Sequence, residues 1–309
     1  MKLVIATRGS ALALWQAEHV RARLMAAEAE LEVALLIIKT TGDKIVDRPL
    51  SQVGGKGLFV KEIEQALIDR QADVAVHSMK DVPAELAPGL VMAAISERED
   101  PRDALVSRGG ETLAVLPAGA RVGTSSLRRV CQLRVLRPDL DLVPLRGNVP
   151  TRIARVDAGD LAAAVLAAAG LVRLGHEGRI AERFDPAVCV PAAGQGALGI
   201  ETRADDAMLR ALCRRVLQHD GDAACVTAER GFLARLGGGC QTPVAAHARL
   251  SAGGAELSLT ALVGRPDGSE IIRGERTGPA AQPAELGAAL GDELMARGAR
   301  RILDELEGA

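Results

Sequence analysis

The stretch His77-Ser78-Met79-Lys80-Asp81-Val82-Pro83 decides the fold of this chain. The residues that lead into it, Asp73-Val74-Ala75-Val76-His77, are mostly apolar and predict a buried strand. A hydroxyl, a cation and a carboxylate follow this strand, and Pro83 prevents its continuation. Because α/β proteins bind ligands at the ends of such strands, we expect these polar side chains to lie at a ligand crevice. A capped turn with a solvated Lys–Asp pair is the alternative that the segment alone leaves open.

Length and composition limit the class of protein. The 309 residues are enough for two or three domains, and 48% hydrophobic with 25% charged residues is the balance of a soluble globular protein. A net charge of -2 gives no general attraction to nucleic acid or an anionic membrane, and one Trp and three Phe are too few for a base-stacking platform. The longest apolar stretch, residues 161–172, is too short and too rich in alanine to span a bilayer. The sequence therefore predicts neither a nucleic-acid nor a membrane partner.

The N-terminal residues and the cysteines indicate the compartment. Residues 1–8 lack the long apolar core of a signal peptide and predict the first strand of a cytoplasmic protein. The 5 cysteines are an odd number, which favours free thiols in such a chain. None has CxxC spacing and no histidine lies at metal-ligand spacing, so the sequence predicts no metal site.

Two segments of the chain follow one plan. The first has a strand at 3–6, a helix that Ser10 caps and that runs to about residue 28, a strand at 33–39, a helix at 58–69 and the strand that ends at Ser78. The second has a short strand ending in hydroxyls at 121–126, a helix at 152–157 and an apolar strand-like run from 160 to 169. These patterns predict two α/β lobes whose helix N-termini face a shared cleft.

A different pattern begins near residue 220. A helix at 222–236 stops at glycines, and strand-like segments follow at 244–250, 256–263 and 270–275, with a hairpin turn at 266–269. Residues 283–307 predict one final helix. The sequence therefore predicts a small α+β domain at this end.

Arginines gather beside the predicted glycine and hydroxyl turns. Each alone is compatible with a solvated surface position, but guanidinium groups and helix N-termini at a crevice both favour carboxylate or phosphate. Together they predict a ligand with several negative charges; they are Arg8, Arg128, Arg129, Arg146, Arg152 and Arg173.

Two glycine-rich segments are candidate functional loops. Gly54-Gly55-Lys56-Gly57 lacks the spacing of a phosphate loop, so we expect a flexible lid that carries Lys56, with Phe59 behind it. Cys240 lies in Gly237-Gly238-Gly239-Cys240-Gln241, where glycines allow close approach of a ligand. It is either a buried cysteine after a helix end or a tethering or nucleophilic thiol.

A series of motifs carries a resemblance to a known family. The chain closely resembles porphobilinogen deaminases, also called hydroxymethylbilane synthases, over nearly its whole length. The matching segments, in this order, are Ala6-Thr7-Arg8-Gly9-Ser10, Val53-Gly54-Gly55-Lys56-Gly57-Leu58-Phe59, Val76-His77-Ser78-Met79-Lys80-Asp81-Val82-Pro83, Gly123-Thr124-Ser125-Ser126-Leu127-Arg128-Arg129, Leu145-Arg146-Gly147-Asn148, Ala169-Gly170-Leu171, Gly194-Gln195-Gly196 and Gly238-Gly239-Cys240-Gln241.

The resemblance implies the fold and the reaction. It implies an α/β fold of two periplasmic-binding-protein-like lobes with a double crossover and a small C-terminal α+β domain, bounded at 1–98 with 194–217, at 99–193 and at 218–309. Members of the family join four porphobilinogen molecules head to tail into hydroxymethylbilane, release an ammonia each time, and serve tetrapyrrole biosynthesis. Growth occurs on a dipyrromethane cofactor held by a thioether, here at Cys240. The resemblance thus implies a small-molecule substrate, and members are usually monomers.

The resemblance also implies residue roles. Asp81 matches the catalytic aspartate and would stabilise the cationic azafulvene left when ammonia departs. The residues that would bind the cofactor are Cys240, Lys80, Ser126, Arg128, Arg129, Thr124 and Ser78. Those that would bind substrate are Arg8, Ser10, Lys56, Phe59, Arg146, Arg152, Arg173 and Gln195. Two positions depart from the family pattern: Gln52 stands where some members carry lysine, and Pro150 stands where glycine is common, although proline suits the first turn of a helix.

Two other classes of function compete with this one. A non-catalytic binding protein for a polycarboxylate or phosphate would use the same cleft, but the glycine-flanked Cys240 and the lack of an export signal count against it. A thiol-dependent transferase would need a base beside Cys240, and His247 is the nearest histidine along the chain.

Overall fold

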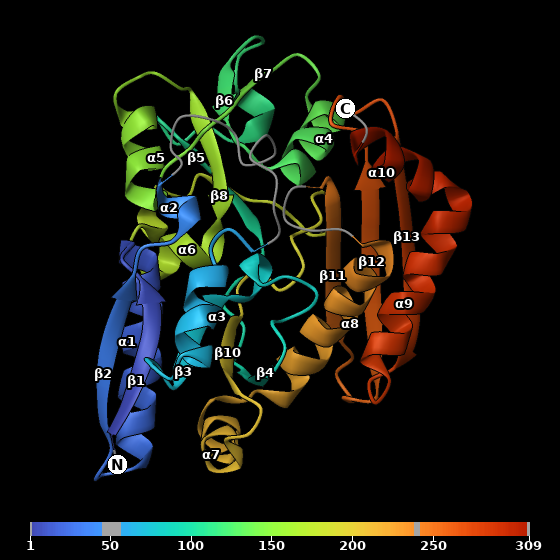
Figure 1. Cartoon of the computed structure of the whole chain (residues 1–309). Helices are drawn as coiled ribbons and strands as arrows, with labels where there is room; N and C mark the ends of the chain where they lie inside the picture. The colour runs from blue at the N-terminus through green and yellow to red at the C-terminus, as the bar shows by residue number, and fades with distance from the viewer. Residues whose placement is uncertain (1, 45–56, 238–241, 308–309) are drawn as a thin grey trace.

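The computed structural model describes residues 2–44, 57–237 and 242–307, so Gln52, Lys56 and Cys240 lie outside the described part of the chain. Two five-stranded mixed sheets and one three-stranded antiparallel sheet form the framework (Figure 1). The two mixed sheets build the lower-left and upper lobes of Figure 1, and the third sheet lies to their right.

The first lobe has the strand order β2-β1-β3-β10-β4. β1 pairs in parallel with β2 and β3, whereas β10 is antiparallel to β3 and β4. The strands are β1 (Lys2–Arg8), β2 (Glu32–Ile38), β3 (Val74–Ser78), β4 (Leu90–Ile95) and β10 (Leu198–Arg203). The helices are α1 (Ala11–Ala27), the single-turn α2 (Thr41–Lys44), α3 (Lys61–Ile68) and α7 (Ala207–Leu217).

The second lobe repeats this plan with the order β7-β6-β8-β5-β9. β6 pairs in parallel with β7 and β8, and β5 is antiparallel to β8, as β10 is to β3. The strands are β5 (Asp103–Ser107), β6 (Arg121–Gly123), β7 (Asp141–Val143), β8 (Ala163–Ala167) and β9 (Glu182–Arg183). The helices are α4 (Leu127–Leu136), α5 (Val149–Asp157) and α6 (Ala168–Arg173).

The sheet order confirms the two α/β lobes and the double crossover. The chain leaves the first lobe after β4, builds the second, and returns as β10 between β3 and β4. The return strand was not among the strands expected from residue patterns. The domain limits at 1–98 with 194–217, 99–193 and 218–309 stay a prediction.

The third sheet and its helices form the C-terminal α+β unit. It comprises β11 (Val244–Leu250), β12 (Glu256–Gly264), β13 (Ile271–Pro279), α8 (Asp220–Leu236), α9 (Pro283–Leu294) and α10 (Arg300–Glu307). The expectation of one helix over 283–307 was wrong. A π-helical turn at Met295–Ala299 contains Gly298 with a φ of 110°, a left-handed conformation that interrupts the helix.

Local signals set several boundaries. The Ser10 Oγ accepts a hydrogen bond from Ala13 N at 3.3 Å and caps α1, and Gly237 ends α8 with a φ of 67°. Asn148 caps α5, with proline in its first turn, as the residue pattern at Pro150 indicates. The strand predicted to run to Ala169 ends at Ala167, because α6 begins at Ala168.

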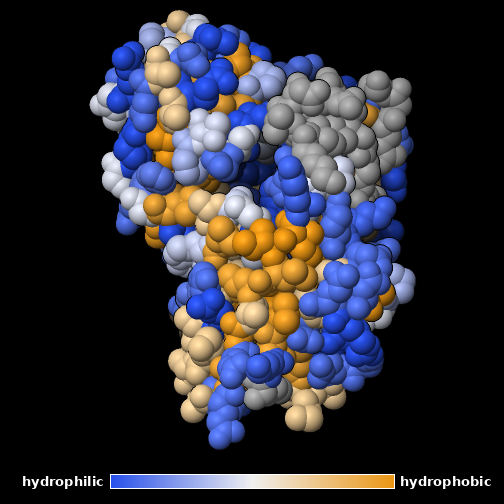
Figure 2. Space-filling view, turned by 60° about the vertical axis from the view of Figure 1, so that its left-hand side comes forward, coloured by the Kyte–Doolittle hydropathy of each residue, from blue (hydrophilic) through white to orange (hydrophobic). Residues whose placement is uncertain are grey.

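The surface differs between the lobes. Figure 2 shows a broad apolar area on the lower lobe, beneath a more hydrophilic upper lobe. The outer strand β2 leaves Ile37 exposed at 60%. In the described residues no helix has both the length and the apolar character needed to cross a membrane.

Candidate active site

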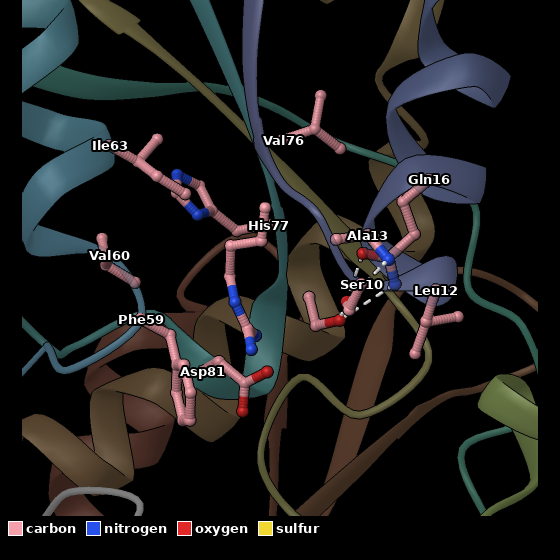
Figure 3. Close-up of a pocket in the computed structure, with 12 residues that line it drawn as sticks. Ser10, Leu12, Ala13, Gln16, Phe59, Val60, Ile63, Val76, His77 and Asp81 are labelled. Atoms are coloured by element: carbon pink, nitrogen blue, oxygen red, sulfur yellow. Dashed lines mark hydrogen bonds between the residues drawn. The ribbon is translucent and has the colours of Figure 1, made fainter. Parts of the chain in front are cut away.

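A cavity in the first lobe lies where β1 and β3 end. Its lining includes Arg8, Ser10 and Phe59 together with His77, Ser78 and Asp81. Figure 3 shows Asp81 beside the Phe59 ring, with Ser10, Ala13 and Gln16 on the opposite wall. Because β1 and β3 are neighbouring parallel strands, their carboxyl ends bring Arg8 and Ser78 to the same edge of the sheet.

Asp81 ends a short 3₁₀ turn, Met79–Asp81, that directly follows β3. Two contacts of Met79 anchor the turn. Its side chain is buried, and its backbone N–H donates a hydrogen bond to Ala197 O at 3.0 Å. Asp81 itself is half-buried at the cavity. The structure therefore holds this carboxylate on a fixed backbone at the edge of the cleft.

Ser78 and His77 each form a hydrogen bond with a polar side chain of the same lobe. Gln16 on α1 donates to the Ser78 Oγ at 2.9 Å. The His77 ring is buried, with its Nε2 2.9 Å from an Oε2 of Glu201 on β10. Burial raises the pKa of nearby Glu64, and Glu201 raises it further, while a hydrogen bond from Ala87 N opposes the rise.

Arg8 already has a partner from its own lobe. Its Nε donates to the two carboxylate oxygens of Asp43 at 3.1 and 3.2 Å, and its guanidinium carbon lies 4.1 Å from the centre of the Phe59 ring. Although burial opposes it, bonds from Arg8 and Thr40 hold the pKa of Asp43 below its ordinary value. Sequence reasoning missed Asp43, which lies in a polar segment with no apolar pattern.

The Lys80 ammonium lies near charged groups of both lobes. Its Nζ donates to Gln195 Oε1 at 3.3 Å. Desolvation lowers the pKa of Lys80 to about 8, with Arg129 and Arg128 acting in the same direction and the carboxylates of Asp81 and Asp103 opposing them. The ammonium is therefore close enough to both lobes to respond to charges on each.

Arg128 and Arg129 are buried at the start of α4 around one carboxylate. Arg128 Nη1 donates to Asp103 Oδ2 at 2.6 Å, and Arg129 Nη2 donates to Asp103 Oδ1 at 2.7 Å. They also donate to the carbonyls of Val190 and Val165, respectively. Although burial raises it, the two guanidinium charges hold the pKa of Asp103 well below its usual range.

The hydroxyl turn before α4 is internally hydrogen-bonded. Thr124 is buried, and its Oγ1 accepts from the N–H of Ser126, the cap residue of α4, at 3.3 Å. Ser125, which was not among the expected site residues, exchanges two 2.9 Å bonds with the Leu145 backbone. This fixes the turn against the loop that carries Arg146.

Arg152 and Arg146 complete a group of cations in the second lobe. Desolvation lowers the pKa of Arg152 to about 10, the charges of Arg129 and Arg146 lower it further, and Asp81 opposes them. Desolvation also lowers the pKa of Arg146. The Arg152 Nε donates to Gly147 O at 2.8 Å, which ties this side chain to the loop that carries Arg146.

Arg173 joins the lobes beside the cleft. Its Nη2 donates to Gly196 O at 2.6 Å, and its guanidinium carbon lies 5.5 Å from the centre of the Trp15 ring on α1. Desolvation lowers the pKa of Arg173 to about 10, and Glu99 opposes this. Trp15 was not singled out by the residue patterns.

The other predicted site residues and the remaining cysteines lie as follows. Lys56 and Cys240 lie outside the described residues, so their positions are not part of this geometry. The other four cysteines are free and buried, and burial raises the pKa of Cys131 and Cys225 to about 11 and that of Cys189 and Cys213 to about 12. In the described residues no group of three or more His, Cys, Asp or Glu could hold a metal ion.

Several solved structures are similar in fold. The methionine-binding protein MetQ has 15% identity and a TM-score of 0.46, covering 70% of this chain and 89% of that chain. The VFT2 domain of Bordetella pertussis BvgS (a double mutant) has 15% identity and a TM-score of 0.43, covering 70% and 86%. The substrate-binding domain of a putative molybdenum ABC transporter from Clostridium difficile has 10% identity and a TM-score of 0.44, covering 72% and 94%.

Two family models match the sequence over most of its length. The model of the porphobilinogen deaminase dipyromethane cofactor binding domain matches residues 3–211. The model of the porphobilinogen deaminase C-terminal domain matches residues 223–296. The chain therefore belongs to the porphobilinogen deaminase family, the hydroxymethylbilane synthases of tetrapyrrole biosynthesis, which use a dipyrromethane cofactor.

Proposed function

We propose that Asp81 is the catalytic carboxylate with which this chain joins four porphobilinogen molecules into hydroxymethylbilane. The observation that carries the proposal is the position of Asp81, on an anchored turn beside Arg8 and within electrostatic reach of Lys80 and Arg152. Loss of ammonia leaves positive charge on the pyrrole of the substrate. A preorganised carboxylate stabilises such charge and accounts for several kcal/mol, roughly 3–4, of the barrier.

The cations around Asp81 suit substrates with carboxylate side chains. Porphobilinogen carries an acetate and a propionate, so the product gains negative charge with every unit added. We assign substrate binding to Arg8, Ser10, Lys56, Phe59, Arg146, Arg152, Arg173 and Gln195. Desolvation lowers the pKa of Arg152, and the charges of Arg129 and Arg146 lower it further; a bound carboxylate would offset both effects.

The donor set also fits a dipyrromethane cofactor. We assign its carboxylates to Ser78, Lys80, Thr124, Ser126, Arg128 and Arg129, and its thioether bond to Cys240. Each of the two guanidinium groups has five N–H donors. Each makes three hydrogen bonds to other residues that the structure describes, which leaves two N–H groups without a partner among those residues. Two N–H groups are what a bidentate carboxylate accepts. When bound, the cofactor supplies the terminal pyrrole on which the product is extended.

We infer that the chain acts as a cytoplasmic monomer with porphobilinogen as its partner. The four buried free cysteines of the described residues support a reducing compartment. The family assignment supports porphobilinogen as substrate. Analytical ultracentrifugation of the holoenzyme tests the monomer, and a stable dimer would contradict it.

The replacement Asp81→Ala tests the function. We expect turnover to fall by at least about 10²-fold with an unchanged circular dichroism spectrum, because the charge is lost from a turn held by its backbone. Glu85→Ala, an exposed carboxylate four residues later, is the matched control and keeps its rate. Porphobilinogen consumption and ammonia release are measured together, and an active Asp81→Ala enzyme would refute the assignment.

Intact mass distinguishes the competing classes of protein. The enzyme carries one dipyrromethane above its sequence mass and gives colour with Ehrlich's reagent. Cys240→Ser should lose both signals. A binding protein would show the bare sequence mass and release no ammonia after incubation with porphobilinogen.

A further inference from the structure

Asp103 is a fully buried carboxylate to which none of the steps above assigns a role. It begins β5, the strand that opens the second lobe, and it is 0% exposed. Arg128 donates to its Oδ2 at 2.6 Å and to its Oδ1 at 3.2 Å. Arg129 donates to Oδ1 through Nε at 3.0 Å and Nη2 at 2.7 Å, and Gln195 Nε2 donates to the same oxygen at 2.9 Å.

The partners of Asp103 require a carboxylate at this position. Every nitrogen that bonds to it belongs to a guanidinium or amide group that can only donate. An asparagine would turn its own NH₂ group toward one of these donors in either orientation of the amide. The site therefore requires a side chain that carries a negative charge and has two oxygen acceptors. The asparagine amide has the same shape but supplies neither.

Gln195 extends the influence of Asp103 to Lys80. Its NH₂ group donates to Pro101 O at 2.7 Å and to Asp103 Oδ1, and both of these oxygens can only accept. Its Oε1 faces the Lys80 ammonium, which can only donate. These partners fix the orientation of the Gln195 amide. Gln195 therefore links the Asp103 carboxylate of the second lobe to the Lys80 ammonium of the first lobe.

We propose that Asp103 is a positioning residue that orients Arg128 and Arg129 toward the carboxylates of the dipyrromethane cofactor and, through Gln195, holds the Lys80 ammonium. The proposal rests on the cofactor-binding roles assigned above. Without Asp103, the two guanidinium groups lose their common acceptor and the direction of their remaining N–H groups is no longer set. Binding of the cofactor then loses its preorganised partner.

Cofactor loading of Asp103→Asn is the first test. The variant is purified alongside Asp100→Asn, a matched replacement three residues earlier whose carboxylate pairs with Arg102 and Arg183 instead. Intact mass after incubation with porphobilinogen reports the loaded fraction, and circular dichroism reports folding. We expect at least a tenfold loss of loading in folded Asp103→Asn and none in Asp100→Asn. Equal loading of the two variants would overturn the proposal.

The variant Gln195→Met decides the question if Asp103→Asn does not fold. It keeps the Asp103–arginine bonds but removes the link to Lys80, whose charged neighbours are Asp81, Asp103, Arg128 and Arg129. We expect normal loading and an alkaline limb of the pH–rate profile shifted down by about 0.5–1 unit, because the ammonium loses an acceptor. A limb that coincides with that of the parent would overturn the proposal.

These outcomes are separable from those of the proposed function. If Asp81→Ala remains active, the catalytic assignment fails whatever Asp103→Asn does. If Asp81→Ala is inactive and Asp103→Asn loads normally, only the positioning role fails.

Discussion

The guanidinium carbon of Arg173, at the end of α6, lies 5.5 Å from the centre of the Trp15 ring on α1. The ring of His19 stacks on Trp15 with 5.1 Å between the ring centres, so the indole contacts both an imidazole and a guanidinium group. Burial, with Arg23 and Arg173 nearby, lowers the pKa of His19 and favours its neutral form. The contact between Trp15 on α1 and Arg173 on α6 joins the two lobes through a residue to which we assign substrate binding.

Replacing Arg173 with methionine should affect both substrate binding and lobe contact. Loss of the cation over Trp15 removes about 0.5–2 kcal/mol, and the bond to Gly196 O is lost with it. We expect KM to rise at least about tenfold, as for loss of a charged hydrogen bond, with a lower Tm. Arg121→Met, at an exposed arginine at the start of β6, should change neither. An unchanged KM would remove Arg173 from the substrate site.

The activity should decline as pH rises through about 8, the pKa of Lys80. The ammonium form binds carboxylates, and desolvation makes it lose its proton earlier than an exposed lysine. Lys80→Arg keeps the charge at high pH, so its alkaline limb should move up by at least about one unit, although kcat falls because the guanidinium has another shape. Lys61→Arg, on an exposed part of α3, should leave the pH–rate profile unchanged.

Glu64→Gln should stabilise the protein at neutral pH. The folded pKa of Glu64 is raised, so its contribution to stability is present below the unfolded pKa and is lost as pH rises through the folded value. Glutamine keeps an oxygen for Ala87 N and carries no charge beside Glu201. We expect a gain of under about 1 kcal/mol at pH 7 and none near pH 4. Thermal melts across this range, with exposed Glu85→Gln as control, would contradict the prediction if the gain were independent of pH.

Gly287→Ala should destabilise the C-terminal unit. A Cβ at residue 287 would lie 2.1 Å from Ala228 O and 2.6 Å from Phe232 N, both backbone atoms of α8. Separating α8 from α9 should cost about 1–3 kcal/mol or more. Gly253→Ala, where no atom lies within 4 Å of the added Cβ, is the control. Equal melting temperatures of the two variants would contradict the prediction, because they would show that α8 and α9 can move apart at no cost in stability.

Much of the local structure follows from residue order. The apolar run before Ser78, the serine cap at residue 10 and the glycine at 237 each act on their own few residues, and β3, α1 and α8 form where these signals predict them. The motifs, taken in sequence order, likewise identify the family. Such signals are local in the chain, so the sequence alone carries them.

Other features depend on segments far apart in sequence. β10 lies between β3 and β4 only because the chain returns after building the second lobe, and no periodicity in residues 198–203 predicts that neighbour. Gln195 bridges Lys80 and Asp103, a link that its motif does not predict.

Asp103 shows the limit of sequence most directly. A charged residue at the start of the apolar run 104–106 was the one available signal, and it does not name a partner. The sequence by itself determined many of the elements, the family and the kinds of charge at the cleft. The tertiary structure decided which cation meets which carboxylate, because hydrogen bonds act over about 3 Å and their partners are separated by 25, 26 and 92 residues along the chain.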